Sequence, residues 1–224
     1  MLIPIENFLN KQTVKKFRES LEDTSWEDGK NTAGGQAQQL KSNLQLASED
    51  PIGKQLGQHI LNILAQHPIF ISAALPKKIF PPKFNNYQNN GHYGLHIDNA
   101  IMYLPDNEVM RTDLSATLFL SEPEEYSGGE LCIETQYGIQ EVKLPAGDMI
   151  LYPSTSLHQV KPVTSGKRIS SFFWIESLIS DSHQREILFD LDQSIQALRN
   201  ENTHNEVSRL TGIYHNLVRK WAQT

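Results

Sequence analysis

Residues 92–98 read HYGLHID and residues 157–170 read LHQVKPVTSGKRIS, and these two stretches predict both the fold and the chemistry of the chain. His96 and Asp98 are two residues apart, so on an extended strand both side chains leave the same face. His158 must then reach them from a later strand. Two imidazoles and one carboxylate hold a non-heme Fe(II) on one face and leave the opposite coordination positions open for oxygen.

Arg168 follows His158 by ten residues and continues into Ile169 and Ser170. A cosubstrate that chelates iron and carries a second carboxylate needs a cation at a fixed distance from the metal. Arginine suits this role because it is always charged and binds a carboxylate through two parallel N–H bonds. An HxD pair alone is a weak signal, whereas the four residues in this order and spacing are specific.

The chain between Lys78 and Ser177 consists of short alternating segments separated by Gly and Pro, which is typical of an antiparallel sandwich or barrel. Eight strands suit a double-stranded β-helix, or jelly-roll. Tyr137 with Gly138 indicates a tight hairpin, and Asp148 belongs to a turn and not to the site. The expected strands are 83–88, 93–98, 115–121, 130–135, 138–143, 148–152, 158–162 and 167–175.

Helical spacing of apolar residues occurs on both sides of this core. We predict helices over 10–23, from Pro51 to Pro68, over 187–198 and over 207–218. Residues 27–46 are expected to form an irregular loop, either a plain connection, which the sequence alone favours, or an active-site flap. The predicted fold is therefore mostly β with flanking helices. Residues 1–77 form an N-terminal helical and loop region, 78–177 the jelly-roll core and 178–224 a C-terminal helical appendage.

Composition indicates an ordinary enzyme. The 224 residues suffice for one sizeable core, and the net charge of −6 offers no dense basic surface, so nucleic acid is not an expected partner. The single cysteine, Cys132, lies in an apolar alternation and fits a reducing compartment. The opening MLIPIENFLNKQ lacks the features of a signal peptide, and no apolar run reaches membrane-spanning length, so we expect a cytoplasmic protein without a membrane partner.

Three longer segments extend the motif: FNNYQNNGHYGLHIDNAIM (84–102), YSGGELCIE (126–134) and LPAGDMILYPSTSLHQVKPVTSGKRISSFFWIES (144–177). They resemble the bacterial PKHD-type hydroxylases, Fe(II)/2-oxoglutarate-dependent dioxygenases related to prolyl 4-hydroxylases. The resemblance implies that His96, Asp98 and His158 bind Fe(II) while Arg168 pairs with the C5 carboxylate of 2-oxoglutarate. It also implies consumption of O2, release of succinate and CO2, hydroxylation of a C–H bond, and ascorbate as a reductant.

Several further residues have two open interpretations. The resemblance suggests that Tyr87 gives its hydroxyl to the cosubstrate, but a tyrosine packed in the sheet is equally compatible with its position. Ser170 and Asn99 either orient the cosubstrate or the metal ligands, or are ordinary satisfied polar groups. His92 is predicted at the rim of the pocket, and the remaining histidines at or near the surface. No catalytic side chain beyond the metal ligands is assigned.

Two other classes of function stay open from the residues alone. A cupin-like isomerase or zinc hydrolase could use the same fold, but it has little use for Arg168 at this spacing. A non-catalytic binding module is the other alternative, and the intact ligand set argues against it. The substrate is expected to be peptidyl, a free amino acid or a small metabolite, and the apolar stripes of the C-terminal helices suggest a homodimer.

Overall fold

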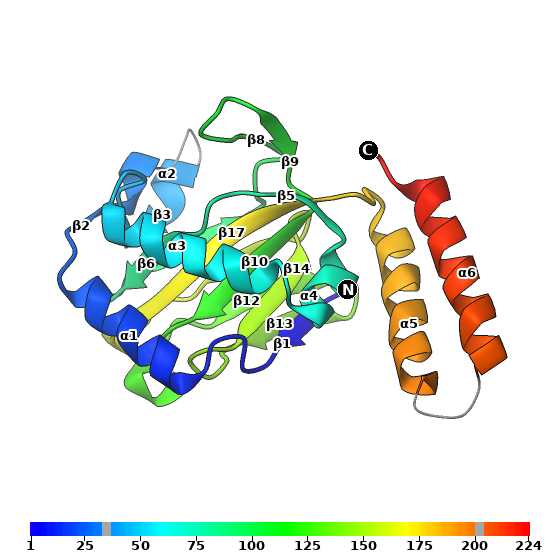
Figure 1. Cartoon of the computed structure of the whole chain (residues 1–224). Helices are drawn as coiled ribbons and strands as arrows, with labels where there is room; N and C mark the ends of the chain where they lie inside the picture. Colours follow the sequence, from blue (N-terminus) through cyan, green and yellow to red (C-terminus); the bar gives the residue numbers. More distant parts are fainter. Residues whose placement is uncertain (33–36, 200–203) are drawn as a thin grey trace.

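Two antiparallel β-sheets form the centre of the computed structural model, which describes residues 1–32, 37–199 and 204–224 (Figure 1). The larger sheet has eight strands in the order β1-β14-β10-β17-β6-β4-β2, with β5 also paired to β17. Its strands are β1 (Ile3–Ile5), β2 (Trp26–Asp28), β4 (Leu44–Leu46), β5 (Pro76–Ile79), β6 (Lys83–Tyr87), β10 (Leu114–Phe119), β14 (Met149–Pro153) and β17 (Arg168–Ser177).

The smaller sheet has five strands in the order β13-β12-β15-β7-β3, and two short two-stranded sheets complete the strands of the described chain. The five strands are β3 (Lys41–Ser42), β7 (His92–His96), β12 (Leu131–Thr135), β13 (Gly138–Val142) and β15 (His158–Val160). The short sheets pair β8 (Ile101–Tyr103) with β9 (Val109–Arg111) and β11 (Tyr126–Gly128) with β16 (Val163–Gly166). The predicted jelly-roll class is confirmed.

Helices cover one face of the larger sheet (Figure 1). They are α1 (Lys11–Glu22), α3 (Pro51–Leu64) and α4 (Pro68–Ala74), beside the short α2 (Ala37–Leu40) and the 3₁₀ turns η1 (Gly29–Thr32) and η2 (Pro123–Glu125). Side-chain oxygens of Asn10 and Asp50 accept from the first-turn N–H groups of α1 and α3, which fixes where both helices begin. The predicted helices over 10–23 and from Pro51 are thereby confirmed.

The alternation along β17 divides the molecule into two apolar layers. Ile169, Phe173 and Ile175 point to the helices, where they pack with buried residues such as Phe17 and Ile60. The opposite face of the sheet meets the smaller sheet through a second cluster. Its buried members are Tyr87, Phe119, Tyr126, Leu131, Ile133, Val142, Ile150, Tyr152, Val160 and Val163.

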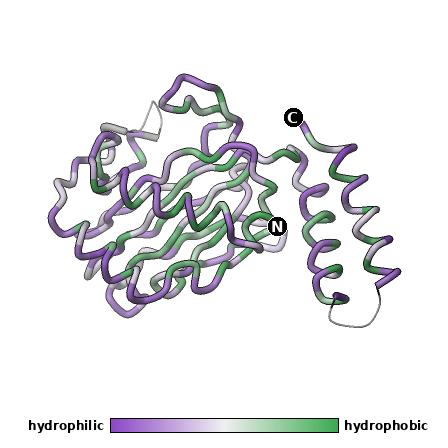
Figure 2. The backbone as a smooth tube through the Cα atoms, viewed as in Figure 1, coloured by the Kyte–Doolittle hydropathy of each residue, from purple (hydrophilic) through white to green (hydrophobic). Residues whose placement is uncertain are grey.

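A helical hairpin of α5 (Ser182–Leu198) and α6 (His204–Trp221) extends beyond the sheets (Figure 1). Hydrophobic residues concentrate along the strands of the core, whereas polar and apolar residues alternate along these two helices (Figure 2). The hydroxyl of Ser72 on α4 donates to Asp192 on α5 at 2.6 Å, which ties the hairpin to the core. None of the described residues of α6 is buried, and no described helix is long and apolar enough to cross a membrane.

Some local predictions are wrong. Pro68 begins a new helix, α4, instead of ending the first helical region directly. The loop predicted over 27–46 contains β3 and β4, which pair with β7 and β6, although residues 33–36 of that prediction lie outside the described residues. The predicted break near 200–205 includes residues 200–203, which also lie outside them. Strand β7 ends at His96, so Asp98 follows the strand and does not belong to it.

The turn before β14 is as predicted. Gly147 has a φ of +101°, and a Cβ at this position would approach the carbonyl oxygen of Leu9 to 2.2 Å. Only glycine fits this combination of positive φ and close contact. Asp148 accepts from the backbone N–H of Asn7 at 2.8 Å and therefore supports the turn, away from the site.

Candidate metal centre and cosubstrate pocket

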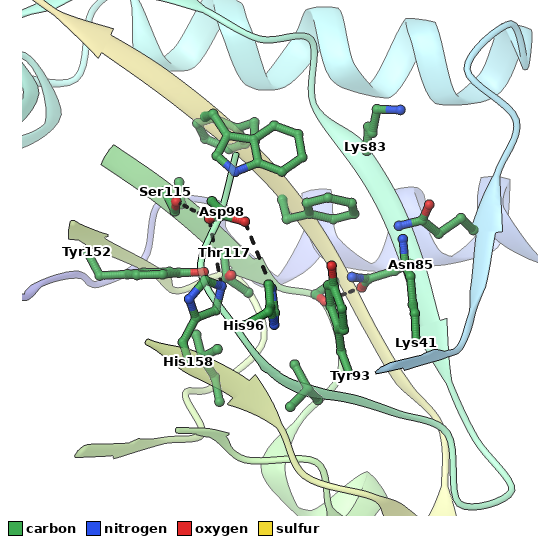
Figure 3. A pocket seen from close by; sticks show the side chains of 18 of the residues that line it. Lys41, Lys83, Asn85, Tyr93, His96, Asp98, Ser115, Thr117, Tyr152 and His158 are labelled. Carbon is green, nitrogen blue, oxygen red and sulfur yellow. Dashed lines mark hydrogen bonds and ion pairs between the residues drawn. The ribbon is translucent and has the colours of Figure 1, made fainter. Parts of the chain in front are cut away.

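His96 and His158 lie opposite each other on adjacent antiparallel strands. Strand β7 pairs with β15 so that His96 and His158 are register partners, and their ring centroids are 4.2 Å apart. Asp98, two residues beyond His96, turns its carboxylate toward both rings (Figure 3). Potential ligand atoms of all three side chains lie within 4.8 Å of one another, close enough to hold one metal ion.

Backbone carbonyl groups fix the orientation of both imidazoles. Nδ1 of His96 lies 2.8 Å from the carbonyl oxygen of Gly94, and Nδ1 of His158 lies 2.9 Å from that of Ser156. Because a carbonyl only accepts, each Nδ1 carries the proton and each Nε2 keeps its lone pair. The Nε2 atoms lie 3.9 Å and 3.7 Å from the carboxylate oxygens of Asp98. This tautomer is the one that metal coordination through Nε2 requires.

The carboxylate of Asp98 is held from behind by Ser115 of β10. The Ser115 hydroxyl donates to Oδ2 of Asp98 at 2.6 Å and lies 2.7 Å from the hydroxyl of Ser154. Such hydrogen bonds to a ligand side chain restrict its rotation and leave its remaining lone pairs aimed at the metal position. Ser115 therefore compensates for the position of Asp98 outside the regular strand.

The environment of His96 favours a neutral ring. Burial, followed by the nearby His158, lowers the pKa of His96 to about 4. The ring of Tyr93 stacks on that of His96 with centroids 3.6 Å apart, and Tyr152 meets His158 edge-on at 5.2 Å. A neutral imidazole does not have to lose a proton when it binds a cation, so near neutral pH His96 is ready for coordination.

Arg168 occupies the inner end of the same cavity and is only 1% exposed. Its Nη1 donates to the hydroxyl of Ser170 at 2.7 Å, and that hydroxyl donates to Oδ1 of Asn85 at 2.5 Å. Among the residues that the structure describes, Nε and Nη2 of Arg168 are buried without a hydrogen-bond partner. Because unpaired buried donors are costly, a charged group with no carboxylate beside it marks the place of an anionic ligand.

Aromatic rings surround this guanidinium. Its central carbon lies 5.3 Å from the ring centroid of Tyr87 and 5.2 Å from that of Phe119, distances at which a cation is attracted by the ring face. Tyr87 is the register partner of Arg168 and receives a long hydrogen bond of 3.4 Å from Asn85 on its hydroxyl. Burial raises the pKa of Tyr87, so the hydroxyl stays protonated and can donate to a ligand.

One cavity of about 150 Å³ connects these two groups of side chains. His96, Asp98 and His158 line one part of it, Arg168 and Ser170 another (Figure 3 shows the three ligands). The sequence predicted that these residues converge, and the structure brings them together. Asn99 also lines the cavity, although its described hydrogen bond is through its backbone carbonyl, which accepts from Thr112 at 2.5 Å.

The histidines outside the sheet are exposed or partly buried, as the sequence predicted, whereas His92 does not line the cavity. His92 is partly buried, outside the cavity lining, and its Nδ1 contacts the carbonyl oxygen of Asn90 at 2.9 Å. The sequence interpretation missed Ser115, Asn85 and two lysines, Lys41 and Lys83, which also line the cavity. Period-two spacing from Tyr87 back to Asn85 and Lys83 is a signal that could have identified two of them.

The fold and these residues define the class of protein. A family model described as the 2OG-Fe(II) oxygenase superfamily matches residues 82–176, and a model described as the PKHD-type hydroxylase C-terminal domain matches residues 182–223. The class is thus the Fe(II)- and 2-oxoglutarate-dependent oxygenases. Within it, the chain belongs to the PKHD-type hydroxylase family, and it is an oxygenase that uses O2 and a substrate.

Curated relatives match along the whole chain. A PKHD-type hydroxylase of Pseudoalteromonas atlantica is 55% identical over 225 residues, covering 99% of each chain. One from Acidovorax ebreus is 55% identical over 226 residues and covers 100% of each chain. Matches of this extent, together with the intact ligand set, decide against the cupin-like enzyme and the non-catalytic module.

Solved structures of lower identity share the fold. The prolyl-4-hydroxylase of Pseudomonas putida has a TM-score of 0.53 at 18% identity and covers 79% of this chain and 92% of its own. HygX from Streptomyces hygroscopicus, solved with nickel and 2-oxoglutarate bound, has a TM-score of 0.53 at 15% identity over 80% of this chain and 84% of its own. At these identities the likeness concerns the fold alone.

Proposed function

We propose that His96, Asp98 and His158 hold one Fe(II) and that Arg168 binds the C5 carboxylate of 2-oxoglutarate in the same cavity. One observation carries this proposal: three lone-pair donors share one cavity with a buried guanidinium, two of whose nitrogens have no hydrogen-bond partner among the described residues. The first set suits a divalent cation and the second suits a carboxylate. Each end of the cavity therefore fits one of the two groups that the family uses.

The chain's own residues orient these groups and exclude water from them. Iron, with 2-oxoglutarate and O2, supplies the oxidation of a substrate C–H bond to an alcohol, with release of succinate and CO2. Gly94 and Ser156 fix the imidazole tautomers through their carbonyls, and Ser115 fixes Asp98. The hydroxyl of Ser170 and the ring of Tyr87 keep the guanidinium of Arg168 in place, and the Tyr87 hydroxyl is proposed to donate to the cosubstrate carboxylate.

We propose ascorbate as the reductant that restores iron after unproductive turnover, a cytoplasmic location and no nucleic-acid partner, which the net charge of −6 supports. Half-exposed apolar residues of the helical hairpin, Ile187 and Ile213, support a homodimer. The family model over 182–223 supports a division into 1–77, 78–177 and 178–224, with the last part a separate helical unit.

Metal binding tests the ligand assignment without knowledge of the substrate. Anaerobic titration with Fe(II) should give one site per chain in the wild type and none of comparable affinity in His158→Ala. His183→Ala is the matched control, because His183 is exposed at the start of α5 and lies outside the cavity. Unchanged iron affinity in His158→Ala would refute the ligand set.

A further inference from the structure

Two lysines from opposite sheets line the cavity outside the residues assigned so far. Lys41 belongs to β3, the edge strand of the smaller sheet, and pairs in register with Tyr93. Lys83 is the first residue of β6 in the larger sheet and pairs with Phe172. Both side chains line the same cavity as the metal ligands, and Figure 3 shows them on the side away from His158.

Burial lowers the pKa of both lysines. Lys41 is 6% exposed, and burial, followed by the charge of Lys83, lowers its pKa to about 8 despite the opposing effect of Asp28. Burial likewise lowers the pKa of Lys83. Lys83 donates to the neutral hydroxyl of Ser48 at 3.2 Å. An anion that enters the cavity beside these ammonium groups offsets the cost of burying their charges.

The register of β17 with β6 separates Lys83 from Arg168. Arg168 faces Tyr87, Ser170 faces Asn85, and Phe172 faces Lys83 along the same side of the sheet. The Cα of residue 172 is four residues beyond that of 168, about 13 Å at the usual rise of a strand. Lys83 thus lies beyond the cosubstrate end of the cavity.

Apolar side chains adjoin the lysines at this outer part. Phe172 and Trp174 of β17 line the cavity, and their rings meet edge to face with centroids 5.5 Å apart. Met102 of β8 lines the cavity as well. A ligand held here would place an anionic group near the lysines and an apolar part against the rings, with its C–H bonds directed toward the metal ligands.

We propose that Lys41 and Lys83 bind a carboxylate of the substrate, so that this oxygenase acts on an organic acid or on a peptide that presents a carboxylate. The proposal rests on the proposed function, because it assumes that Arg168 is occupied by 2-oxoglutarate. Both sheets then contribute to one anionic subsite, the larger sheet through Lys83 and the smaller sheet through Lys41.

The test uses protein loaded with Mn(II), which replaces iron without turnover, and saturated with 2-oxoglutarate. The probes are 3-phenylpropanoate and its neutral amide, and the readout is the relaxation of probe protons by the paramagnetic ion, which reports binding close to the metal. We expect the acid to bind at least about tenfold more tightly than the amide, because only the carboxylate carries a charge that attracts the two ammonium groups. Equal binding of acid and amide would overturn the proposal.

Variants assign the preference to the two lysines. Lys41→Met and Lys83→Met should each reduce binding of 3-phenylpropanoate about tenfold while leaving the affinity for 2-oxoglutarate unchanged. Methionine matches the length of the buried stem, and thermal unfolding checks that each variant is folded. Lys15→Met is the matched control, because the Lys15 side chain is 77% exposed on α1. Unchanged probe binding in both folded variants would contradict the assignment.

A charge reversal gives an independent result. Lys83→Glu should abolish the preference for 3-phenylpropanoate over its neutral amide, because the new carboxylate offsets the charge of Lys41; retention of the full acid preference would contradict a direct contact. If the lysine variants weaken 2-oxoglutarate instead, the lysines serve the cosubstrate and the proposal is wrong. Failure of the wild type to bind 2-oxoglutarate, measured before any probe is added, would instead refute the proposed function.

A blocked dipeptide with a free C-terminal carboxylate distinguishes the two sources of the anion. Tighter lysine-dependent binding of the dipeptide than of 3-phenylpropanoate supports a peptidyl substrate, and the reverse supports a small organic acid. Lysine-independent binding of both probes overturns the subsite.

Discussion

The two ends of the cavity present opposite kinds of polar atom, lone pairs at one end and N–H donors at the other. At one end, His96, Asp98 and His158 turn lone pairs toward a single point while their other polar atoms are bound from behind. At the other end, the buried Nε and Nη2 of Arg168 have no hydrogen-bond partner in the described chain. Lone pairs need a cation and N–H donors need an anion. This difference supports the proposal that the cavity holds a metal ion and a carboxylate together.

Replacement of Asp98 should cause the largest loss of iron affinity. Loss of a residue behind a ligand typically costs about 10–100-fold in metal affinity, so we expect Asp98→Ala to lose more than about 100-fold. The two imidazoles that remain cannot supply the negative charge. Iron content after anaerobic reconstitution and release of succinate from 2-oxoglutarate are the measurements. Asp98→Ala protein that retained a full equivalent of iron would show that another carboxylate is the ligand.

Replacement of Arg168 should weaken the binding of 2-oxoglutarate and leave metal binding nearly unchanged. Hydrogen bonds to charged groups contribute about 1.5–3 kcal/mol each, so Arg168→Ala should weaken 2-oxoglutarate roughly tenfold to a few hundredfold. Calorimetric titration of the Mn(II)-loaded protein measures this, and metal affinity should remain within about twofold of the wild type. The 2-oxoglutarate affinity of Arg168→Lys should lie between those of the wild type and Arg168→Ala, because lysine keeps the charge but cannot donate two parallel N–H bonds. Unchanged affinity in Arg168→Ala would refute the role of this residue.

Ser115 should affect metal binding indirectly, because its hydroxyl holds the carboxylate of Asp98. Ser115→Ala removes the 2.6 Å hydrogen bond to Asp98, and we expect iron affinity to fall about tenfold. Affinity for 2-oxoglutarate in the metal-loaded variant should change less. Ser20→Ala, on the exposed side of α1, is the matched control. If Ser115→Ala binds iron as tightly as the control, Asp98 is oriented by the backbone alone.

His92 should have the smallest effect. It lies on β7 four residues before His96, but its ring contacts the carbonyl of Asn90 and lies outside the cavity lining. His92→Ala should therefore keep iron affinity within about twofold of the wild type in the same titration. Loss of iron in this variant would mean that the ligands have been misassigned.

The sequence predicted the features that depend on local spacing. The alternation along residues 168–175 separates the core side from the cavity side, and the helices predicted over 10–23 and from Pro51 begin where they were expected. Ligand types and their order brought His96, Asp98 and His158 together before any strand pairing was known. The strand faces and helix starts could be predicted because each rests on residues only a few positions apart, whereas His158 was assigned from its residue type and its spacing to Arg168.

Features that depend on distant pairing could not be predicted in this way. Residues 27–46 have few apolar side chains, and the short strands β3 and β4 exist because β7 and β6, 52 and 42 residues later at Lys41↔Tyr93 and Leu44↔Asn86, supply partners. Lys41 faces the cavity only because β3 joins the edge of the smaller sheet. Ser115 reaches Asp98 across the two sheets, and no spacing in the sequence indicates that contact.

Anaerobic titration of the Fe(II)-loaded protein with 2-oxoglutarate tests whether the metal ligands and Arg168 form one site, because both must bind the same molecule. The measurement is the weak metal-to-ligand charge-transfer absorption in the visible, which requires 2-oxoglutarate to chelate iron through two oxygens. The band should appear and saturate at one equivalent in the wild type, and it should need far more 2-oxoglutarate in Arg168→Ala. Iron-loaded protein that never develops the band would contradict the shared site.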